Sequence, residues 1–227
     1  MRNSFRALAL AAAIGVSTSA HAAIVDGGFE FPGSPNLTIY GSGQSIGAWT
    51  VTGAQGNAVL LLSTNYTEAG VAFNAHSGNY ALDLTGAGNT GSGNGVYQNI
   101  ATAIGQTYAL TFWVGNATGD GTGNSGVYTL PSSTNLTIDL NAPVSFTNAN
   151  ITSGGINWQQ FTYEFTAADI STRIAFLNNT ASGDNYLGLD DVSIAAVPGP
   201  IMGAGLPGLV MALGGLLAWR RRRMAVA

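Results

Sequence analysis

Short segments in which apolar and polar residues alternate constrain this chain more than any other feature, because a period of two is typical of strands buried on one face. In Tyr108–Val114 every second residue from Tyr108 is large and apolar, whereas Thr111 lies on the opposite face. In Gln160–Thr166 the aromatic residues alternate with polar ones in the same way, and Tyr80–Leu84 follows the pattern. These segments predict antiparallel sheets with one face in a core and the other in water.

Further apolar segments lie between clusters of Gly, Ser, Thr and Asn, which are typical turn residues. They predict strands at Ile24–Phe29, Ala48–Val51, Val59–Leu62, Val96–Ile100, Leu136–Leu140, Arg173–Leu177 and Leu187–Ile194. About ten short strands in this length favour an all-β fold, a two-sheet jelly-roll sandwich. The glycine-rich stretches Thr85–Gly95 and Asn116–Gly126 are interpreted as surface loops, since no lysine and no helix start follow them as a phosphate-binding loop requires.

The first 22 residues have the pattern of a secretory signal peptide. Arg2 and Arg6 form the basic region, Ala7–Val16 the apolar region, and Ala20–Ala22 the A-x-A cleavage site. We therefore expect an N-terminal signal helix over residues 1–22 and export across the inner membrane.

Near the other end, Ile201–Trp219 carries no charge and would form a helix of about 28 Å, close to the hydrocarbon thickness of a bilayer. Arg220, Arg221, Arg222 and Arg223 follow it directly. Because arginines remain on the cytoplasmic side, the sequence predicts one transmembrane helix over 201–219, with residues 23–197 outside the cytoplasm as one β-sandwich domain.

Residues 198–223 resemble the PEP-CTERM sorting tail, in which a Pro-x-Pro motif, one apolar helix and an arginine cluster follow each other. Here the motif is Pro198-Gly199-Pro200, with glycine where that family has glutamate. The resemblance implies that an exosortase recognises the tail and that the protein passes from a membrane-anchored precursor to the cell surface or extracellular matrix. A plain stop-transfer anchor that is never processed remains the alternative, because topology requires only the helix and the arginines.

Residues 23–197 are strongly acidic. All eleven carboxylates lie there, with Arg173 as the only basic residue, so the net charge is about −10. Such a surface repels nucleic acid and anionic lipid. The chain has no cysteine, which excludes disulfides and thiolate metal sites.

Four short motifs resemble carbohydrate-binding-module and galactose-binding-like jelly rolls: Asp26–Glu30, Gly105–Phe112, Trp158–Phe161 and Leu189–Ile194. In those families the first and last strands are neighbours and hold a structural calcium ion. Carried over by position, the resemblance implies a Ca2+ site formed by Glu30, Asp190 or Asp191, and the carbonyl of Gly28.

Charge repulsion supports the calcium prediction on separate grounds. Asp190 and Asp191 are adjacent in an otherwise apolar strand and repel each other, more so if Glu30 lies close. A hard cation that takes six to eight oxygen ligands would relieve the repulsion. The alternative is that one aspartate faces water and the other caps a turn.

Tryptophans are the candidate sugar platforms, since pyranose C–H faces stack on aromatic rings while hydroxyls need polar partners. Trp113 is the strongest candidate for a sugar platform, because strand parity places it opposite the core face. Trp49 and Trp158 are the next candidates, because they lie near turns. Core packing is the alternative for each tryptophan.

Nothing in the sequence identifies an enzyme. His76 is the only histidine after residue 22, no G-x-S-x-G motif frames a nucleophile, and no spacing singles out a carboxylate pair. Arg173 is interpreted as a cross-strand partner of Glu164 in a hairpin. Two interpretations remain: an exported, non-catalytic module that binds extracellular polysaccharide, and a structural matrix or surface component with no specific glycan ligand.

Overall fold

A computed structural model describes residues 22–53, 58–87, 93–118, 128, 130–151, 154–181, 185–198 and 214–216. Outside these residues lie residues 1–21 of the predicted signal peptide, Gly199, Pro200, Arg220–Arg223, most of Ile201–Trp219 and much of both glycine-rich loops. Residues 214–216 are helical, and none of the helical structure described is long and apolar enough to cross a bilayer.

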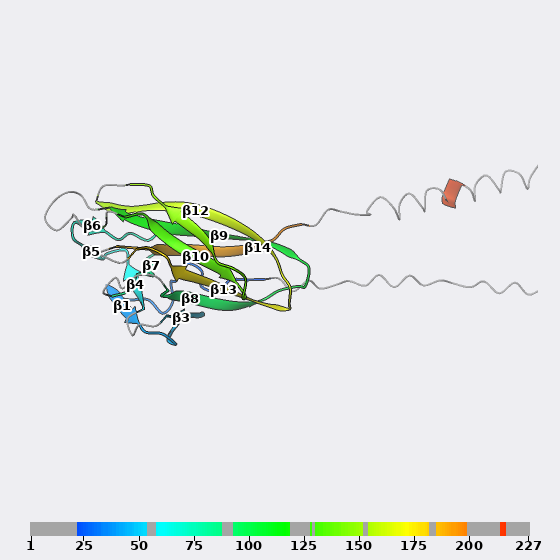
Figure 1. Cartoon of the computed structure of the whole chain (residues 1–227), viewed down its shortest axis with the longest axis horizontal. Coiled ribbons are helices and arrows are strands. Elements are labelled where there is room, and N and C mark those ends of the chain that lie inside the picture. The colour runs from blue at the N-terminus through cyan, green and yellow to red at the C-terminus, as the bar shows by residue number, and fades with distance from the viewer. Residues whose placement is uncertain are drawn as a thin grey trace, which may run out of the picture.

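The described body is all-β (Figure 1). Its strands are β1 (Leu37–Tyr40), β2 (Ser45–Ile46), β3 (Trp49–Thr52), β4 (Val59–Ser63), β5 (Thr67–Glu68), β6 (Val71–Ala72), β7 (Tyr80–Asp83), β8 (Gly95–Ala101), β9 (Thr107–Thr118), β10 (Ser132–Ile138), β11 (Val144–Asn148), β12 (Gly155–Thr166), β13 (Ser171–Asn178) and β14 (Gly188–Ala196). Sheet A has the order β1-β4-β7-β14-β9-β12, sheet B has the order β11-β10-β13-β8-β3-β2, and β5 and β6 form a hairpin. All strand pairs are antiparallel, which confirms the predicted two-sheet sandwich.

The alternation in the sequence places the core between the two sheets. In β9 the side chains of Tyr108, Leu110, Phe112 and Val114 are buried, whereas those between them are partly exposed. β12 pairs with β9 over its whole length and directs its polar residues outward. From sheet B, Phe176 of β13 meets Phe112, with ring centroids 4.8 Å apart. The strand faces predicted from parity for Tyr108–Val114 and Gln160–Thr166 are therefore confirmed. For Tyr80–Leu84 the prediction of one wet face is wrong, because Ala81 and Asp83 are buried as well as Leu82.

The predicted first strand is wrong. Ile24–Phe29 forms no regular strand, because Asp26 and Phe29 both have positive φ angles, 54° and 55°, which break an extended conformation. The segment still lies beside the last strand: the Val192 amide donates to the carbonyl of Gly27 at 2.9 Å.

The predicted pairing of Arg173 with Glu164 is also wrong. β12 and β13 do not form a hairpin, because the chain between them crosses from sheet A to sheet B. β13 pairs instead with β8 and β10, and Asn99 is the residue opposite Arg173. Two consecutive strands with one apolar face each can bury both faces by lying in opposite sheets.

A second apolar cluster lies apart from the main core. It comprises Leu62, Val71, Phe73, Ala117, Tyr128 and Tyr186. Near this cluster, Asp83 is only 6% exposed, and its Oδ1 accepts hydrogen bonds from the Thr85 amide, the Thr85 hydroxyl and the Leu187 amide. Burial raises the pKa of the Asp83 carboxyl to about 6, although these hydrogen bonds lower it.

Candidate functional site

The three acids of the predicted calcium site meet one loop, residues 74–80. Asp190 is fully buried, and its Oδ2 accepts hydrogen bonds from the backbone amides of His76 at 2.9 Å and Ser77 at 3.2 Å. The Oε1 atom of Glu30 accepts from the amides of Asn79 at 2.8 Å and Tyr80 at 3.1 Å. Carboxylates from the first and last segments of the domain thus bind the amides of a loop that lies between them in sequence.

Asp191 completes this cluster at the surface. Its Oδ2 lies 2.6 Å from His76 Nδ1, and its Oδ1 accepts a hydrogen bond from the Ser77 hydroxyl at 2.8 Å. A β-bulge between Asp190 and Ser193, together with a φ of 47° at Asp191, turns these consecutive side chains in different directions. Gly28 passes close by, since a Cβ added there would lie 3.4 Å from Asp191 Oδ1.

Asp190 has an unusually high proton affinity. Burial, together with the neighbouring charge of Asp191, raises the pKa of Asp190 to about 7, although the hydrogen bonds from the amides of Asp191, Ser77 and His76 oppose the shift. The amide donors stabilise the ionised form and thereby offset part of the repulsion that the sequence assigned to a cation.

Calcium remains a prediction at this site. Among the described residues, no group of three or more His, Cys, Asp or Glu side chains is placed to hold a metal ion. Glu30 and Asp190 direct oxygens to N–H donors of the 74–80 loop, and Asp191 accepts from the Ser77 hydroxyl, so donors of this loop already occupy oxygens of all three carboxylates.

Chelation tests the calcium prediction directly. If an ion binds these carboxylates, excess chelator lowers the melting temperature, and Glu30→Ala removes that dependence, because a ligand that binds only the native state stabilises it. Thermal melts of both proteins with calcium and with chelator make the comparison. A wild-type melt that does not change in chelator contradicts the prediction.

Trp113 lies on the outer face of sheet A, as parity predicted. It is partly exposed, and the ring of His76 stacks on it with centroids 3.7 Å apart and an interplanar angle of 18°. Trp158 is also partly exposed, and its indole N–H donates to the carbonyl of Asn74 at 3.0 Å. Both tryptophans therefore pack against the 74–80 loop, and His76 occupies one face of the Trp113 ring.

Trp49 does not belong to a surface site. It is 0% exposed, packs between Phe29 and Phe176, and donates its indole N–H to the carbonyl of Asp26 at 2.9 Å. The prediction of Trp49 as a sugar platform is therefore wrong, because Trp49 occupies an inward position of β3 despite its nearness to a turn.

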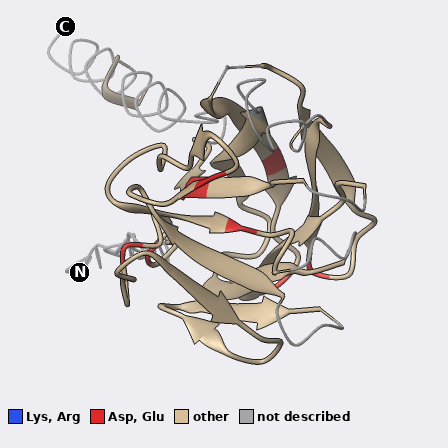
Figure 2. Cartoon of the chain, turned by 90° about the vertical axis from the view of Figure 1, so that its left-hand side faces the viewer, with Lys and Arg blue, Asp and Glu red and all other residues tan. Residues whose placement is uncertain are grey.

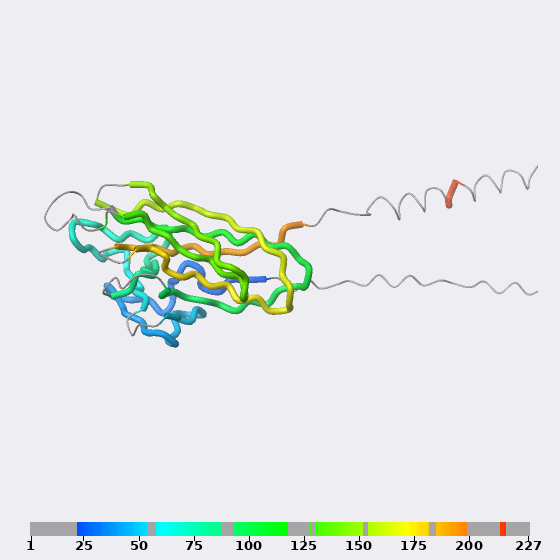
Figure 3. Tube along the Cα trace, in the orientation of Figure 1, coloured from blue at the N-terminus to red at the C-terminus, as the bar shows by residue number. Residues whose placement is uncertain are grey.

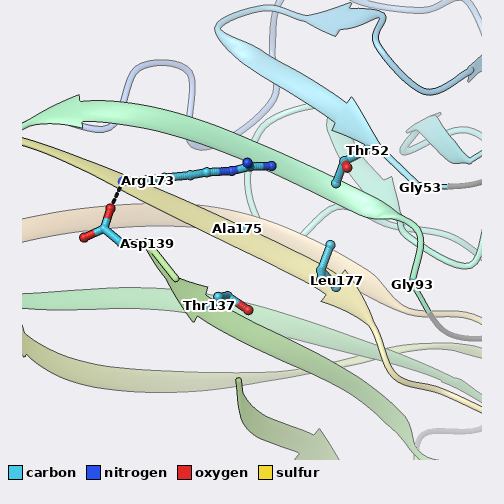
Figure 4. Close-up of a pocket in the computed structure, with 8 residues that line it drawn as sticks. All are labelled: Thr52, Gly53, Gly93, Thr137, Asp139, Arg173, Ala175 and Leu177. Atoms are coloured by element: carbon cyan, nitrogen blue, oxygen red, sulfur yellow. Dashed lines mark hydrogen bonds between the residues drawn. The ribbon is translucent and has the colours of Figure 1, made fainter. Parts of the chain in front are cut away.

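A groove crosses the outer face of sheet B (Figure 4). It has a volume of about 440 Å³ and is lined by Thr52, Gly53, Gly93, Thr137, Asp139, Arg173, Ala175 and Leu177. On β13, Ile174 and Phe176 face the core, so Arg173, Ala175 and Leu177 face the groove. The Arg173 side chain extends along the groove towards Thr52.

Arg173 is held in place from two directions. Its amide donates to Asp139 Oδ1 at 2.7 Å, and the Asp139 amide donates to the carbonyl of Arg173 at 2.8 Å. Its guanidinium carbon lies 3.7 Å from the ring centroid of Tyr97, which is a cation–π contact. Within the described part of the chain, the guanidinium forms no ion pair with a carboxylate.

The sequence did not identify this groove. Tyr97 and Asp139 were not singled out, and Arg173 was assigned to a different strand partner. One signal was present: Arg173 is the only basic residue beside eleven acids in residues 23–197.

Together these features define an all-β sandwich protein with an open polar groove across one sheet. Residues 22–195 match the family described as "Protein of unknown function (DUF642)", and the chain belongs to this family. No curated protein is significantly similar to the sequence.

Two solved structures from Fischerella sp. TAU share the fold. A cyclase in complex with 4-(1H-indol-3-yl)butan-2-one is 18% identical, with a TM-score of 0.57, over 78% of this chain and 97% of that one. The Stig cyclase Fisc is 17% identical, with a TM-score of 0.59, over 81% of this chain and 100% of that one. The module CBM61 in complex with β-1,4-galactotriose is 15% identical over 77% of this chain and 97% of that one, and its TM-score of 0.44 supports no further argument.

Proposed function

We propose that this protein is a non-catalytic glycan-binding β-sandwich whose ligand lies in the groove on sheet B. The observation that supports this proposal is an open groove in which Arg173, held by a cation–π contact with Tyr97, lies beside hydroxyl and carboxylate groups. The guanidinium supplies several N–H donors, while Thr52, Thr137 and Asp139 supply oxygen acceptors. Sugars need such a mixture, because each hydroxyl both donates and accepts hydrogen bonds.

The cation–π contact lowers the cost of binding. Stacking on Tyr97 restricts the rotamers of a long side chain before a ligand arrives, so less conformational entropy is lost on binding. Since the guanidinium forms no ion pair with any described carboxylate, its donors are available to a ligand.

The charge of the domain favours neutral glycans over anionic ones. In Figure 2 the acidic positions, in red, occur on several parts of the sandwich. One arginine among eleven acids leaves a repulsive field for a polyanion.

The residues of this groove support ligand binding better than catalysis. The fold itself does not decide the matter, since the two similar structures from Fischerella are cyclases. Among the described residues that line the groove, however, Asp139 is the only general acid or base, and its Oδ1 already accepts a hydrogen bond from the Arg173 amide. We further propose the cellular setting that the two ends of the sequence imply: export across the inner membrane, processing by an exosortase, and contact with extracellular polysaccharide at the cell surface or in the matrix.

Calorimetric titration with soluble neutral polysaccharides tests the site. We expect Arg173→Ala and Tyr97→Ala each to weaken binding by at least about tenfold, because hydrogen bonds to a charged donor contribute about 1.5–3 kcal/mol. Trp113→Ala on sheet A is the matched control and should leave the affinity unchanged. Loss of binding in the Trp113 variant alone would move the site to sheet A. Self-assembly with no glycan bound would favour the structural matrix component instead.

A further inference from the structure

We propose that one end of the sandwich rests on the surface of the bilayer that residues 201–219 enter, with Ile104 and Ile170 in contact with lipid. The proposal rests on the predicted membrane span and does not depend on glycan binding. The partner is a neutral phospholipid surface.

The two isoleucines belong to one surface made of two turns. The Thr102 amide donates to the carbonyl of Ile170 at 2.9 Å, and the Gly105 amide donates to the carbonyl of Ala167 at 2.8 Å. These bonds hold the turn between β8 and β9 against the turn between β12 and β13. At their tips, Ile104 is 67% exposed and Ile170 is 70% exposed.

A third apolar side chain lies at the same end. Leu140 follows β10 and is fully exposed. The register Ile138↔Ile174 between β10 and β13 places it near the start of β13, where Ser171 pairs with Ala101 at the end of β8.

The chain is fixed to this end just before the predicted span. The Val197 amide donates to the carbonyl of Thr107 at 2.9 Å, and the Gln106 side chain donates to the carbonyl of Val197 at 2.8 Å. Three residues separate Val197 from Ile201, so the distance between these two Cα atoms is at most about 14 Å. The polar region of one leaflet is about 5–8 Å thick, so this tether keeps the turns close to the membrane.

The geometry of the termini agrees with this placement. Figures 1 and 3 show the first part of the domain, in blue, and the last strand, in orange, reaching the same end of the sandwich. Exposed apolar residues also occur at the opposite end, where Ile151 is 76% exposed on the loop before β12. The tether at Val197 therefore decides which end meets lipid.

The charges near the turns define the lipid class. Residues 102–106 and 167–170 contain no basic residue, while Asp169 and Asp139 lie next to Ile170 and Leu140. Anionic head groups would be repelled, so the contact consists of apolar side chains entering a neutral interface.

Single-cysteine labelling tests the proposal, since the chain contains no cysteine. Ile104→Cys, Ile170→Cys and the control Ile151→Cys are labelled with an environment-sensitive fluorophore in the full chain and reconstituted into phosphatidylcholine vesicles. We expect blue-shifted emission that is quenched by nitroxide-labelled lipid at positions 104 and 170, and water-like, unquenched emission at 151.

A second measurement separates insertion from mere proximity. A label on Leu140→Cys should be quenched in the otherwise unchanged chain and lose part of that quenching when Ile104→Ser and Ile170→Ser are added. Equal, water-like emission at 104, 170 and 151 overturns the proposal, as does a full chain that fails to float with the vesicles. Quenching at 151 equal to that at 104 also overturns it.

Discussion

Trp49→Ala is expected to lower the free energy of unfolding by about 3–5 kcal/mol, the usual cost of removing a buried tryptophan from a core. The indole is 0% exposed and lies 5.5 Å from the ring of Phe29 and 6.2 Å from that of Phe176, measured between centroids. Its removal leaves a cavity between the sheets and takes the indole N–H donor from the carbonyl of Asp26. Urea denaturation of both proteins measures the difference.

Trp113→Ala is the matched control for this experiment. Trp113 is partly exposed on the outer face of sheet A, where His76 is its stacking partner, so we expect a loss of about 0.5–1.5 kcal/mol. If Trp49→Ala cost no more than Trp113→Ala, Trp49 would not lie in the core, and its correction from ligand platform to core residue would be wrong.

The pH dependence of stability is expected to change when Asp83 is replaced by asparagine. Burial raises the pKa of Asp83 from 3.8 to about 6, so the folded protein holds this proton at pH values where the unfolded chain has lost it. Its contribution to the free energy of unfolding is therefore intact below about pH 4 and falls as the pH rises to about 6. At about 1.4 kcal/mol for each pKa unit, the loss is on the order of 3 kcal/mol.

Asp83→Asn keeps an oxygen that can accept the Thr85 and Leu187 hydrogen bonds but cannot ionise. The free energies of unfolding of both proteins, measured by denaturation between pH 4 and pH 8, should be most similar near pH 4, diverge as the pH rises to about 6 and stay apart above it, with the variant more stable there. Because Asp190 and Asp26 also have raised pKa values, the difference between the two proteins isolates Asp83. Parallel curves across the range would contradict the assignment.

Strand faces could be predicted well because they depend on local spacing alone. The alternation in Tyr108–Val114 and Gln160–Thr166 gives the inward and outward sides of β9 and β12 correctly, and Trp113 lies on the side predicted for it. The same reasoning failed where local backbone geometry intervened, as at Ile24–Phe29, whose positive φ angles follow no simple residue pattern.

Pairing between strands could not be predicted in the same way. Nothing in the sequence shows that the chain passes from β12 in sheet A to β13 in sheet B. The incorrect Arg173–Glu164 pair followed from the assumption that consecutive strands form hairpins. Correcting the partner changes the interpretation of Arg173 from a hairpin contact to the cation of a groove.

The amino-acid sequence by itself determined that this chain is a β-sandwich and which faces of its long strands are apolar, because side-chain alternation is a property of a few consecutive residues. Only the tertiary structure decided which side chains share a site. Residues 52, 97, 139 and 173 meet on sheet B, and Glu30, Asp190 and Asp191 meet the loop at His76, through pairings between segments that are far apart in the chain. Such contacts follow from the order of strands in the sheets, and the free energy that selects this order comes from burying both apolar faces together rather than from any one segment.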